Sequence, residues 1–240
     1  WLKKENVAVE RLEGGYKEFR SYIVSQHSDT KSYTKSWKVI GGLTGSGKTQ
    51  LLNQFDEAID LEKIANHRGS AFGKNNSEQP SQANFENIIT DKYLNHIPPQ
   101  IYIEDESRTI GRVTLPESWY GKMQSSDLIL LKISNEKRVN NILNEYVVEA
   151  LKDFSNESEL LKQYLSSLDK IKKRLGGELY KNISSLMIEA FNKNKNHEDW
   201  ISKLLMMYYD PMYKYKLSMR KKYITHIGDY KSCYEYLGDS

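Results

Sequence analysis

The chain has 240 residues and a formal net charge of +3, and 38% of its residues are hydrophobic. These values suit a globular domain, and no apolar run approaches the ~18–20 residues that cross a bilayer. The single cysteine, Cys233, excludes an internal disulfide framework and a cysteine-based zinc site, and it favours a buried thiol in a cytoplasmic protein. The chain begins with Trp1 and lacks a secretory signal, so we expect a piece of a longer protein.

Charge and aromatic residues are unevenly distributed along the chain. Residues 161–240 carry 15 Lys and Arg against 9 Asp and Glu, so the first 160 residues carry 20 against 23. Ten of the 17 tyrosines also lie in this last third. A basic, aromatic region is typical of a protein that binds nucleic acid. Solvated helices have a similar composition, so both interpretations stay open.

The first hundred residues alternate between predicted strands and helices. Residues 36–42 (SWKVIGG) are an apolar run that enters glycines, which indicates a strand, and residues 49–55 (TQLLNQF) begin a helix. A second short strand is predicted at 57–62 (EAIDLE). Residues 74–82 are polar and predict an exposed loop. Apolar residues at helical spacing over 85–97 predict a helix, which the following proline pair ends.

The middle of the chain continues this alternation. Residues 100–106 (QIYIEDE) predict a third strand that ends in acidic side chains, and residues 127–134 (DLILLKIS) predict a fourth strand that is buried on both faces. Apolar residues then recur at helical spacing over 139–154, which indicates one long amphipathic helix.

The last third is predominantly helical. The pattern stays helical over 157–222, with breaks expected at Gly176–Gly177 and at Asp210–Pro211, and residues 222–228 (KYITHIG) predict a last strand. Strands that alternate with helices indicate an α/β fold, a P-loop NTPase-like doubly wound parallel sheet with a helical C-terminal extension. The predicted divisions are 1–30 as a tail and linker, 31–150 as the P-loop α/β core, and 151–240 as a helical extension that returns to the sheet.

A phosphate-binding motif follows the first predicted strand. Gly42, four residues, and then Gly47, Lys48 and Thr49 match the pattern GxxxxGK[ST]. Glycines let backbone N–H groups form an anion nest, the lysine adds a positive charge, and the threonine hydroxyl is suited to Mg²⁺. The predicted phosphate-binding residues are Gly42, Thr44, Gly45, Ser46, Gly47, Lys48 and Thr49.

Acidic residues end the third predicted strand, where a carboxylate can hold Mg²⁺ beside the phosphate loop. Glu104 and Asp105 are the predicted metal ligands together with Thr49, and Glu106 is a third candidate acid. The spacing leaves open which of the three acids holds the metal.

Further charged residues follow the predicted strands and should converge at the same edge of the sheet. They are Asp60, Glu62, His67, Arg68, Arg108 and Arg112. Three arginines exceed what the phosphates of one nucleotide require, and they suit a second phosphorylated partner such as a nucleic-acid backbone. A single histidine is more often a hydrogen-bonded structural residue than a proton carrier.

Five segments together resemble the tRNA 2-selenouridine synthase family. They are GLTGSGKT, DLEKIANHRGSAFG, QPSQANFE, EDESRTIG and LLMMYYDPMYKYKL, in this order within residues 37–217. Of these, HRGSAFG and YYDPMY are more specific than the phosphate loop. The opening VERLEGGYKEFR also resembles the end of the rhodanese domain that precedes this region in the family.

The resemblance implies a two-stage change of the wobble uridine of certain tRNAs. The sulfur of 2-thiouridine is first prenylated with geranyl diphosphate, and selenium from selenophosphate then replaces the alkylated sulfur. On this interpretation the phosphate loop binds the diphosphate of the prenyl donor, with Mg²⁺. The implied catalytic residues are Lys48, Asp60, His67, Arg68, Glu104 and Asp105, with Asp60 or His67 orienting the uracil or accepting its N3 proton.

Contacts with the anticodon region of tRNA are expected from the arginines and from the segment YYDPMYKYKLSMRKKY, in which tyrosines alternate with basic residues. The predicted tRNA-binding residues are Arg68, Arg108, Arg112, Tyr213, Lys214, Lys216 and Arg220. Packing should bury Leu204, Leu205, Tyr208 and Met212, whereas the basic side chains should be solvated. Contact with RNA and plain solvation are equally compatible with this segment.

One departure from the family concerns selenium. Full-length members carry a reactive cysteine in the rhodanese domain, and Cys233 lies in the wrong place to replace it. We therefore expect prenylation and tRNA binding from this chain, and selenation with a rhodanese domain of the full-length protein or of a separate chain and with an enzyme that supplies selenophosphate. No membrane partner is expected. The competing functions are a P-loop kinase or ATPase acting on a small substrate and a non-catalytic tRNA-binding subunit.

Overall fold

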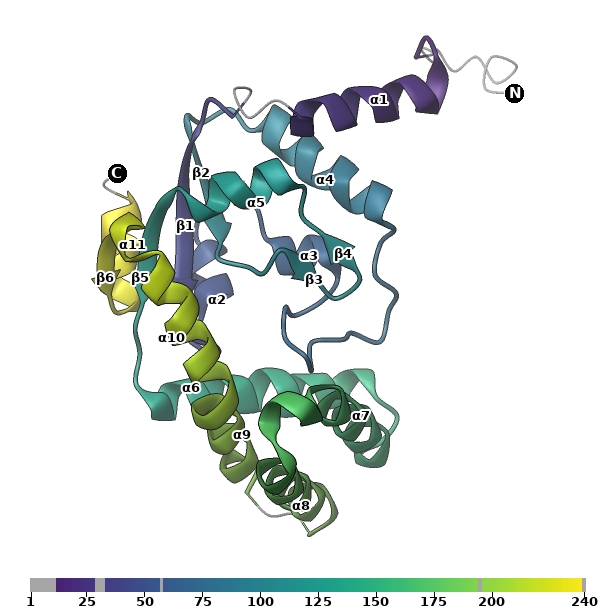
Figure 1. The fold of residues 1–240 in the computed structure, drawn as a ribbon, viewed down its shortest axis with the longest axis vertical. Helices are drawn as coiled ribbons and strands as arrows, with labels where there is room; N and C mark the ends of the chain where they lie inside the picture. Colours follow the sequence, from purple (N-terminus) through teal and green to yellow (C-terminus); the bar gives the residue numbers. More distant parts are fainter. Residues whose placement is uncertain (1–11, 29–32, 57, 194–195, 239–240) are drawn as a thin grey trace.

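A parallel sheet of four strands forms the upper part of the protein in the computed structural model, which describes residues 12–28, 33–56, 58–193 and 196–238 (Figure 1). The strand order is β2-β1-β5-β6, and each neighbouring pair is parallel. The strands are β1 (Ser36–Gly42), β2 (Gln100–Glu104), β5 (Asp127–Leu131) and β6 (Ile224–Gly228). The predicted α/β class, the parallel sheet and the final strand are therefore confirmed.

Helices cover both faces of this sheet, because its central strands β1 and β5 are apolar on both sides. One face packs on the helices α3 (Leu61–Ala65), α4 (Gln82–Asn95) and α5 (Glu117–Gln124). The opposite face packs on α2 (Lys48–Leu52) and α11 (Tyr230–Gly238), where Cys233 is fully buried as expected.

Smaller elements complete this part of the molecule. Helix α1 (Gly15–Ser28) lies against α4, where the guanidinium of Arg20 pairs with Glu86 and donates to Asn87. A two-stranded hairpin, β3 (Thr109–Ile110) and β4 (Val113–Thr114), follows β2. Residues 1–11, on which part of the predicted tail falls, lie outside the described residues.

The strand predicted at 57–62 is wrong in the described part of that segment, residues 58–62. Only Ile59 forms a bridge, parallel to Ile103 at the edge of β2. The carboxylate of Asp60 accepts a hydrogen bond from the backbone N–H of Lys63 at 2.8 Å, which caps a helix that begins at Leu61. An N-cap aspartate satisfies donors of the first helical turn, and here it favours a helix over a strand.

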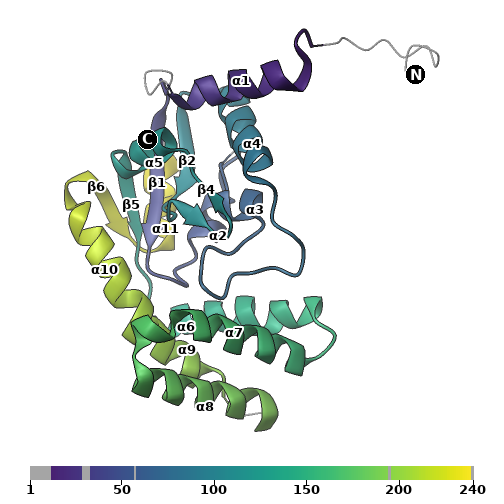
Figure 2. The same ribbon diagram turned by 45° about the vertical axis from the view of Figure 1, so that its right-hand side comes forward.

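A helical subdomain lies beneath the carboxyl edge of the sheet in both views (Figures 1 and 2). The helix predicted over 139–154 is one continuous helical stretch, but it changes from α to π to 3₁₀ hydrogen bonding along its length. The elements of the subdomain are α6 (Asn135–Leu143), η3 (Asn144–Glu149), η4 (Ala150–Asp153), α7 (Glu157–Leu175), α8 (Gly177–Lys193), α9 (Glu198–Leu204) and η5 (Leu205–Tyr209). The helix α10 (Asp210–Met219) and the turn η6 (Lys221–Tyr223) follow it.

Of the two predicted breaks, the glycine pair at 176–177 does separate α7 from α8. The predicted break at Asp210–Pro211 is wrong, because the π-helical η5 runs directly into α10 with Pro211 in its first turn. A proline is tolerated in the first helical turn because its missing N–H has no helical acceptor there.

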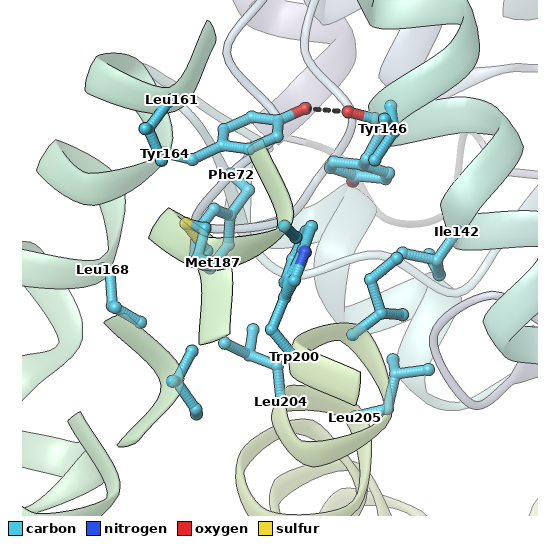
Figure 3. Packing of buried hydrophobic residues seen from close by; sticks show 14 of the residues in the cluster. Phe72, Ile142, Tyr146, Leu161, Tyr164, Leu168, Met187, Trp200, Leu204 and Leu205 are labelled. Atoms are coloured by element: carbon cyan, nitrogen blue, oxygen red, sulfur yellow. Dashed lines mark hydrogen bonds between the residues drawn. The ribbon is translucent and has the colours of Figure 1, made fainter. Parts of the chain in front are cut away.

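Tyrosine and tryptophan rings organise the core of the helical subdomain, as Figure 3 shows. The hydroxyl of Tyr164 on α7 donates to the backbone carbonyl of Tyr146 in the π-helical turn η3, and the ring of Phe72 packs edge-on against Tyr164. Leu204, Leu205 and Tyr208 are buried, and Met212 packs against the same core, as predicted.

Helix α10 then leads from this subdomain back to β6 (Figure 2). None of the helices in the described part of the chain combines the length and the apolar character that a membrane span requires.

Candidate functional site

The phosphate loop lies between β1 and α2, as the motif predicts. Gly45 (φ +79°) and Gly47 (φ +87°) adopt left-handed backbone conformations that favour glycine. A Cβ on Gly45 would also lie 2.8 Å from the carbonyl oxygen of Arg138 in α6. The first of these glycines therefore serves both the turn and the close approach of α6.

Two side chains of α6 hold the outer side of this loop. Arg138 Nε donates to the carbonyl of Thr44 at 2.9 Å, and Asn141 Nδ2 donates to the carbonyl of Gly45 at 2.9 Å. The Arg138 guanidinium also forms a buried two-point ion pair with Asp210, at the start of α10, with one contact of 2.9 Å. The loop conformation is therefore fixed by both α6 and α10.

A cavity of about 540 Å³ opens between the phosphate loop and the helical subdomain. The residues singled out from the sequence that line it are Thr44, Gly45, Gly47, Lys48, Thr49, Asp60, Glu62, His67, Arg68, Glu106 and Tyr213. Gly42 and Ser46 lie behind this lining. The Ser46 hydroxyl is buried and has no hydrogen-bond partner among the described residues. The structure thus brings most of the predicted catalytic and phosphate-binding residues to one site.

Three glutamates form a cluster beside this loop, two of them fully buried and Glu62 partly so. Carboxylate oxygens of Glu62, Glu104 and Glu106 lie within 4.8 Å of one another. The hydroxyl of Thr49 donates to Glu104 Oε2 at 3.3 Å, and the backbone N–H of Glu62 donates to Glu104 Oε1 at 2.9 Å. Burial raises the pKa of all three carboxyls, and for Glu62 and Glu104 the neighbouring carboxylates add to this shift. Holding three carboxylates in charged form so close together costs free energy unless positive charge lies near them.

The donor set fits a hard divalent cation such as Mg²⁺, which prefers oxygen ligands. The acids that line the cavity are Asp60, Glu62, Glu106, Glu145 and Glu149, and the lysine and arginine side chains that do so are Lys48, Lys63 and Arg68. This excess of carboxylates would repel a diphosphate. A bound cation would offset the negative charge of the clustered carboxylates and would reduce their repulsion of a diphosphate. Glu62, Glu104 and Glu106 are placed to be its ligands.

Asp105, the other predicted metal ligand, points elsewhere. Its carboxylate forms an ion pair with Arg220, which also donates to the backbone carbonyls of Met123 and Gln124. Arg220 is only 6% exposed, so the expectation of a solvated side chain at this position is wrong. Its three acceptors and its burial give Arg220 a structural role.

The candidate proton carriers lie at the cavity wall. The carboxylate of Asp60 is engaged in capping α3. His67 is half-buried, and burial lowers its pKa, so its imidazole is neutral at pH 7. Arg68 lies 3.6 Å from Glu145 and 5.4 Å from the ring centroid of Tyr146, which holds its guanidinium in the cavity.

The other predicted RNA contacts are spread over the surface. Arg108 pairs with Glu117 at 2.6 Å, and Arg112 is exposed; neither lines the phosphate cavity. Lys214 and Lys216 are exposed on α10, as expected. Tyr213 instead faces the phosphate loop, with its ring centroid 5.9 Å from Lys48 Nζ.

Sequence patterns did not single out several residues of this site. The sequence placed Glu62 at this edge of the sheet but did not assign it to the metal, and its position beside Glu104 follows only from the fold of α3. Arg138 and Asn141 lie in an ordinary amphipathic helix, and nothing in the sequence pattern pairs Arg138 with Asp210.

The comparisons with known proteins identify the family of the chain. The sequence profile described as the tRNA 2-selenouridine synthase AAA domain matches residues 35–240. The chain is 38% identical to the tRNA 2-selenouridine synthase of Shewanella frigidimarina, over 99% of this chain and 69% of that protein. It is 40% identical to that of Shewanella denitrificans, over 100% of this chain and 69% of that protein. The comparison with solved structures finds no significant match. The chain belongs to the tRNA 2-selenouridine synthase family.

Proposed function

We propose that the protein takes part in converting 2-thiouridine to 2-selenouridine at the wobble position of tRNA, as a transferase that prenylates the RNA. The names of its relatives support tRNA selenouridine modification. One observation carries the assignment to this cavity. Lys48 and a cluster of three carboxylates border the same phosphate loop, which suits a diphosphate bound with a divalent cation.

In the proposed first step, the thiocarbonyl sulfur attacks C1 of geranyl diphosphate. A C–S bond forms, the C1–O bond breaks, and diphosphate leaves with the electron pair. Lys48 and the loop amides stabilise the charge on the leaving group. His67 accepts the N3 proton of the alkylated base, since its imidazole is neutral and Asp60 is engaged as a helix cap. Glu62, Glu104, Glu106 and Thr49 would hold the Mg²⁺, which would neutralise charge on the departing diphosphate.

In the proposed second step, selenium from selenophosphate replaces the alkylated sulfur at C2. The C2–S bond breaks, geranyl thiol leaves, and water cleaves the Se–P bond to give phosphate. Cys233 is buried against the sheet and does not line the cavity, so it does not supply a reactive thiol. The chain spans about two thirds of its longer relatives. We therefore assign prenylation and tRNA binding to it, and selenation to its action with a rhodanese domain and a selenophosphate-supplying enzyme.

The test is alkylation of an anticodon stem-loop that contains 2-thiouridine, in the presence of Mg²⁺ and geranyl diphosphate, followed by mass spectrometry. Lys48→Ala should slow alkylation by about 10²–10³-fold, because it removes a charge that stabilises the leaving group. Lys231→Ala alters an exposed lysine of α11 and should leave the rate unchanged.

A parallel reaction contains ATP in place of geranyl diphosphate. Rapid ATP turnover by the unaltered protein, together with no alkylation in the main reaction, would contradict the proposal and favour a phosphotransferase. A Lys48→Ala protein that alkylates at the unaltered rate would remove the loop from the mechanism.

A further inference from the structure

A second cavity of about 210 Å³ adjoins the phosphate cavity on the other side of a thin wall. Glu106 and Tyr213 line both cavities and form that wall. The second cavity lies between the segment after β2, helix α5 and helix α10. Its further lining residues are Asp105, Ser107, Tyr120, Gln124, Tyr215, Lys216, Met219 and Arg220. It is smaller than the ~300–1,000 Å³ typical of drug-sized ligands, which suits a single ring.

Aromatic and apolar groups give this cavity a stacking surface. Tyr120, Tyr213 and Tyr215 contribute three rings from two helices. Tyr215 is 70% exposed and Met219 is 69% exposed, one helical turn apart on the same face of α10. Apolar surface exposed beside a cavity is one mark of a binding surface. Tyrosine rings stack on unpaired nucleobases with little dependence on sequence.

The charged groups of the cavity suit RNA despite its acidic residues. The buried guanidinium of Arg220 neutralises Asp105 at the base of the cavity. The ammonium of Lys216 lies 3.0 Å from Ser107 Oγ and 5.7 Å from the ring centroid of Tyr213, so it sits at the mouth. The ammonium of Lys216 can donate to a carbonyl oxygen of a uracil.

We propose that this second cavity binds the target pyrimidine of the RNA after it has turned out of its stack. This inference rests on the proposed function, which supplies an RNA substrate and a diphosphate donor. The reacting atoms of two substrates must approach within about 3–3.5 Å. A base in the second cavity can present its C2–N3 edge at the boundary formed by Glu106 and Tyr213, towards the diphosphate and His67 in the first cavity. Enzymes that modify bases commonly take the base out of the stack in this way.

The test is photo-crosslinking of a stem-loop that carries 5-iodouridine at the target position, with the crosslinked peptides identified by mass spectrometry. The crosslink should map to α10 at Tyr213 or Tyr215, or to Tyr120 on α5. Tyr215→Ala should weaken stem-loop binding by about 5- to 150-fold, the usual range for loss of one base–aromatic stack. Tyr234→Ala, which alters a tyrosine of α11 that is 45% exposed, should not change binding.

The two proposals fail in different ways. A crosslink confined to another element, or unchanged binding by Tyr215→Ala, would overturn the base site even if alkylation proceeds normally. A crosslink on α10 in a protein that never alkylates the RNA would support the base site and refute the proposed chemistry. Lys48→Ala should retain the crosslink, because Lys48 does not line the second cavity.

Discussion

Three clustered glutamates at the phosphate loop illustrate which single residues a sequence reveals. Glu104 was identifiable because it ends an apolar strand, where side chains reach the carboxyl edge of a parallel sheet. Its neighbour in sequence, Asp105, points to the opposite side and pairs with Arg220, since successive strand residues face opposite ways. Glu62 joins the cluster from the first turn of α3; the sequence predicted that it lies at this edge, but not that it contacts the other two carboxylates.

These carboxyls make a prediction about pH. Burial and the carboxylates of Glu104 and Glu106 raise the pKa of Glu62 in the folded protein. The folded state therefore holds this proton at pH values where the unfolded chain releases it, and the resulting stability is lost as pH rises above the ordinary glutamate range. Without divalent cations, this one carboxyl should lower the free energy of unfolding by up to about 1.4 kcal/mol per pH unit.

Chemical denaturation from about pH 5 to about pH 8, with a chelator, measures this effect. Comparison with Glu62→Gln isolates the group, because the half-buried histidines His27, His67 and His197, whose pKa burial lowers, contribute the opposite slope in both proteins. The unaltered protein should lose more stability across this range than the variant, and Mg²⁺ should reduce the difference. Equal slopes in the two proteins would show that Glu62 is not held protonated.

At the scale of elements, the contact between α6, the phosphate loop and α10 depends on one buried ion pair. Arg138 is 2% exposed and Asp210 is 5% exposed. The same guanidinium donates to the carbonyl of Thr44 in the loop. The helical subdomain is thus attached to the site by charge and hydrogen bonding in addition to apolar packing.

Arg138→Met should lower the free energy of unfolding by about 3–5 kcal/mol, because it leaves the Asp210 carboxylate buried without its partner. The double change Arg138→Met with Asp210→Leu removes both charges and should recover much of that loss. The double variant should nevertheless bind diphosphate more weakly than the unaltered protein, because the Thr44 carbonyl has lost its donor. Denaturant titration and calorimetric binding of inorganic diphosphate check the two effects. A double variant that binds normally would mean that Arg138 has no part in positioning the loop.

Most strands and helices follow from the sequence, whereas departures from regular hydrogen bonding do not. The apolar runs of β1, β2, β5 and β6 identify the whole sheet. The π-helical turns at 144–149 and 205–209 carry no comparable signal, because they depend on tertiary contacts such as the bond from Tyr164 to the carbonyl of Tyr146. The second strand was mispredicted for a similar reason, since one N-cap outweighed a short apolar pattern.

At the scale of the whole molecule, part of the basic C-terminal third lies beside the two cavities. The basic C-terminal third includes α10, which borders both cavities, and the turn η6 that follows it. Lys221 and Lys222 are exposed there, beside the proposed base site. Composition alone did not distinguish RNA contact from solvation, and the position of these lysines favours RNA contact.

Replacing both Lys221 and Lys222 by alanine should weaken stem-loop binding by a similar factor for every sequence, because phosphate contacts carry no base information. The dependence of log affinity on log salt should become shallower by about 1.4–1.8, since two fewer phosphates are neutralised. Binding titrations at several salt concentrations measure this slope. Replacing Lys172 and Lys173, which are exposed on α7, serves as the matched control. A larger loss of affinity in the control than in the η6 variant would place the RNA backbone on the helical subdomain.

The route of the chain into the sheet also constrains how the protein forms. Strands β5 and β6 are neighbours, yet the entire helical subdomain separates them along the chain. Closing so long a connection costs entropy before any pairing repays it. During synthesis β5 therefore has one unpaired edge, open to association with other chains, until β6 has been made. Synthesis that stops shortly before β6 would give a chain that contains most residues of the phosphate cavity, but in which one edge of β5 still lacks its partner strand.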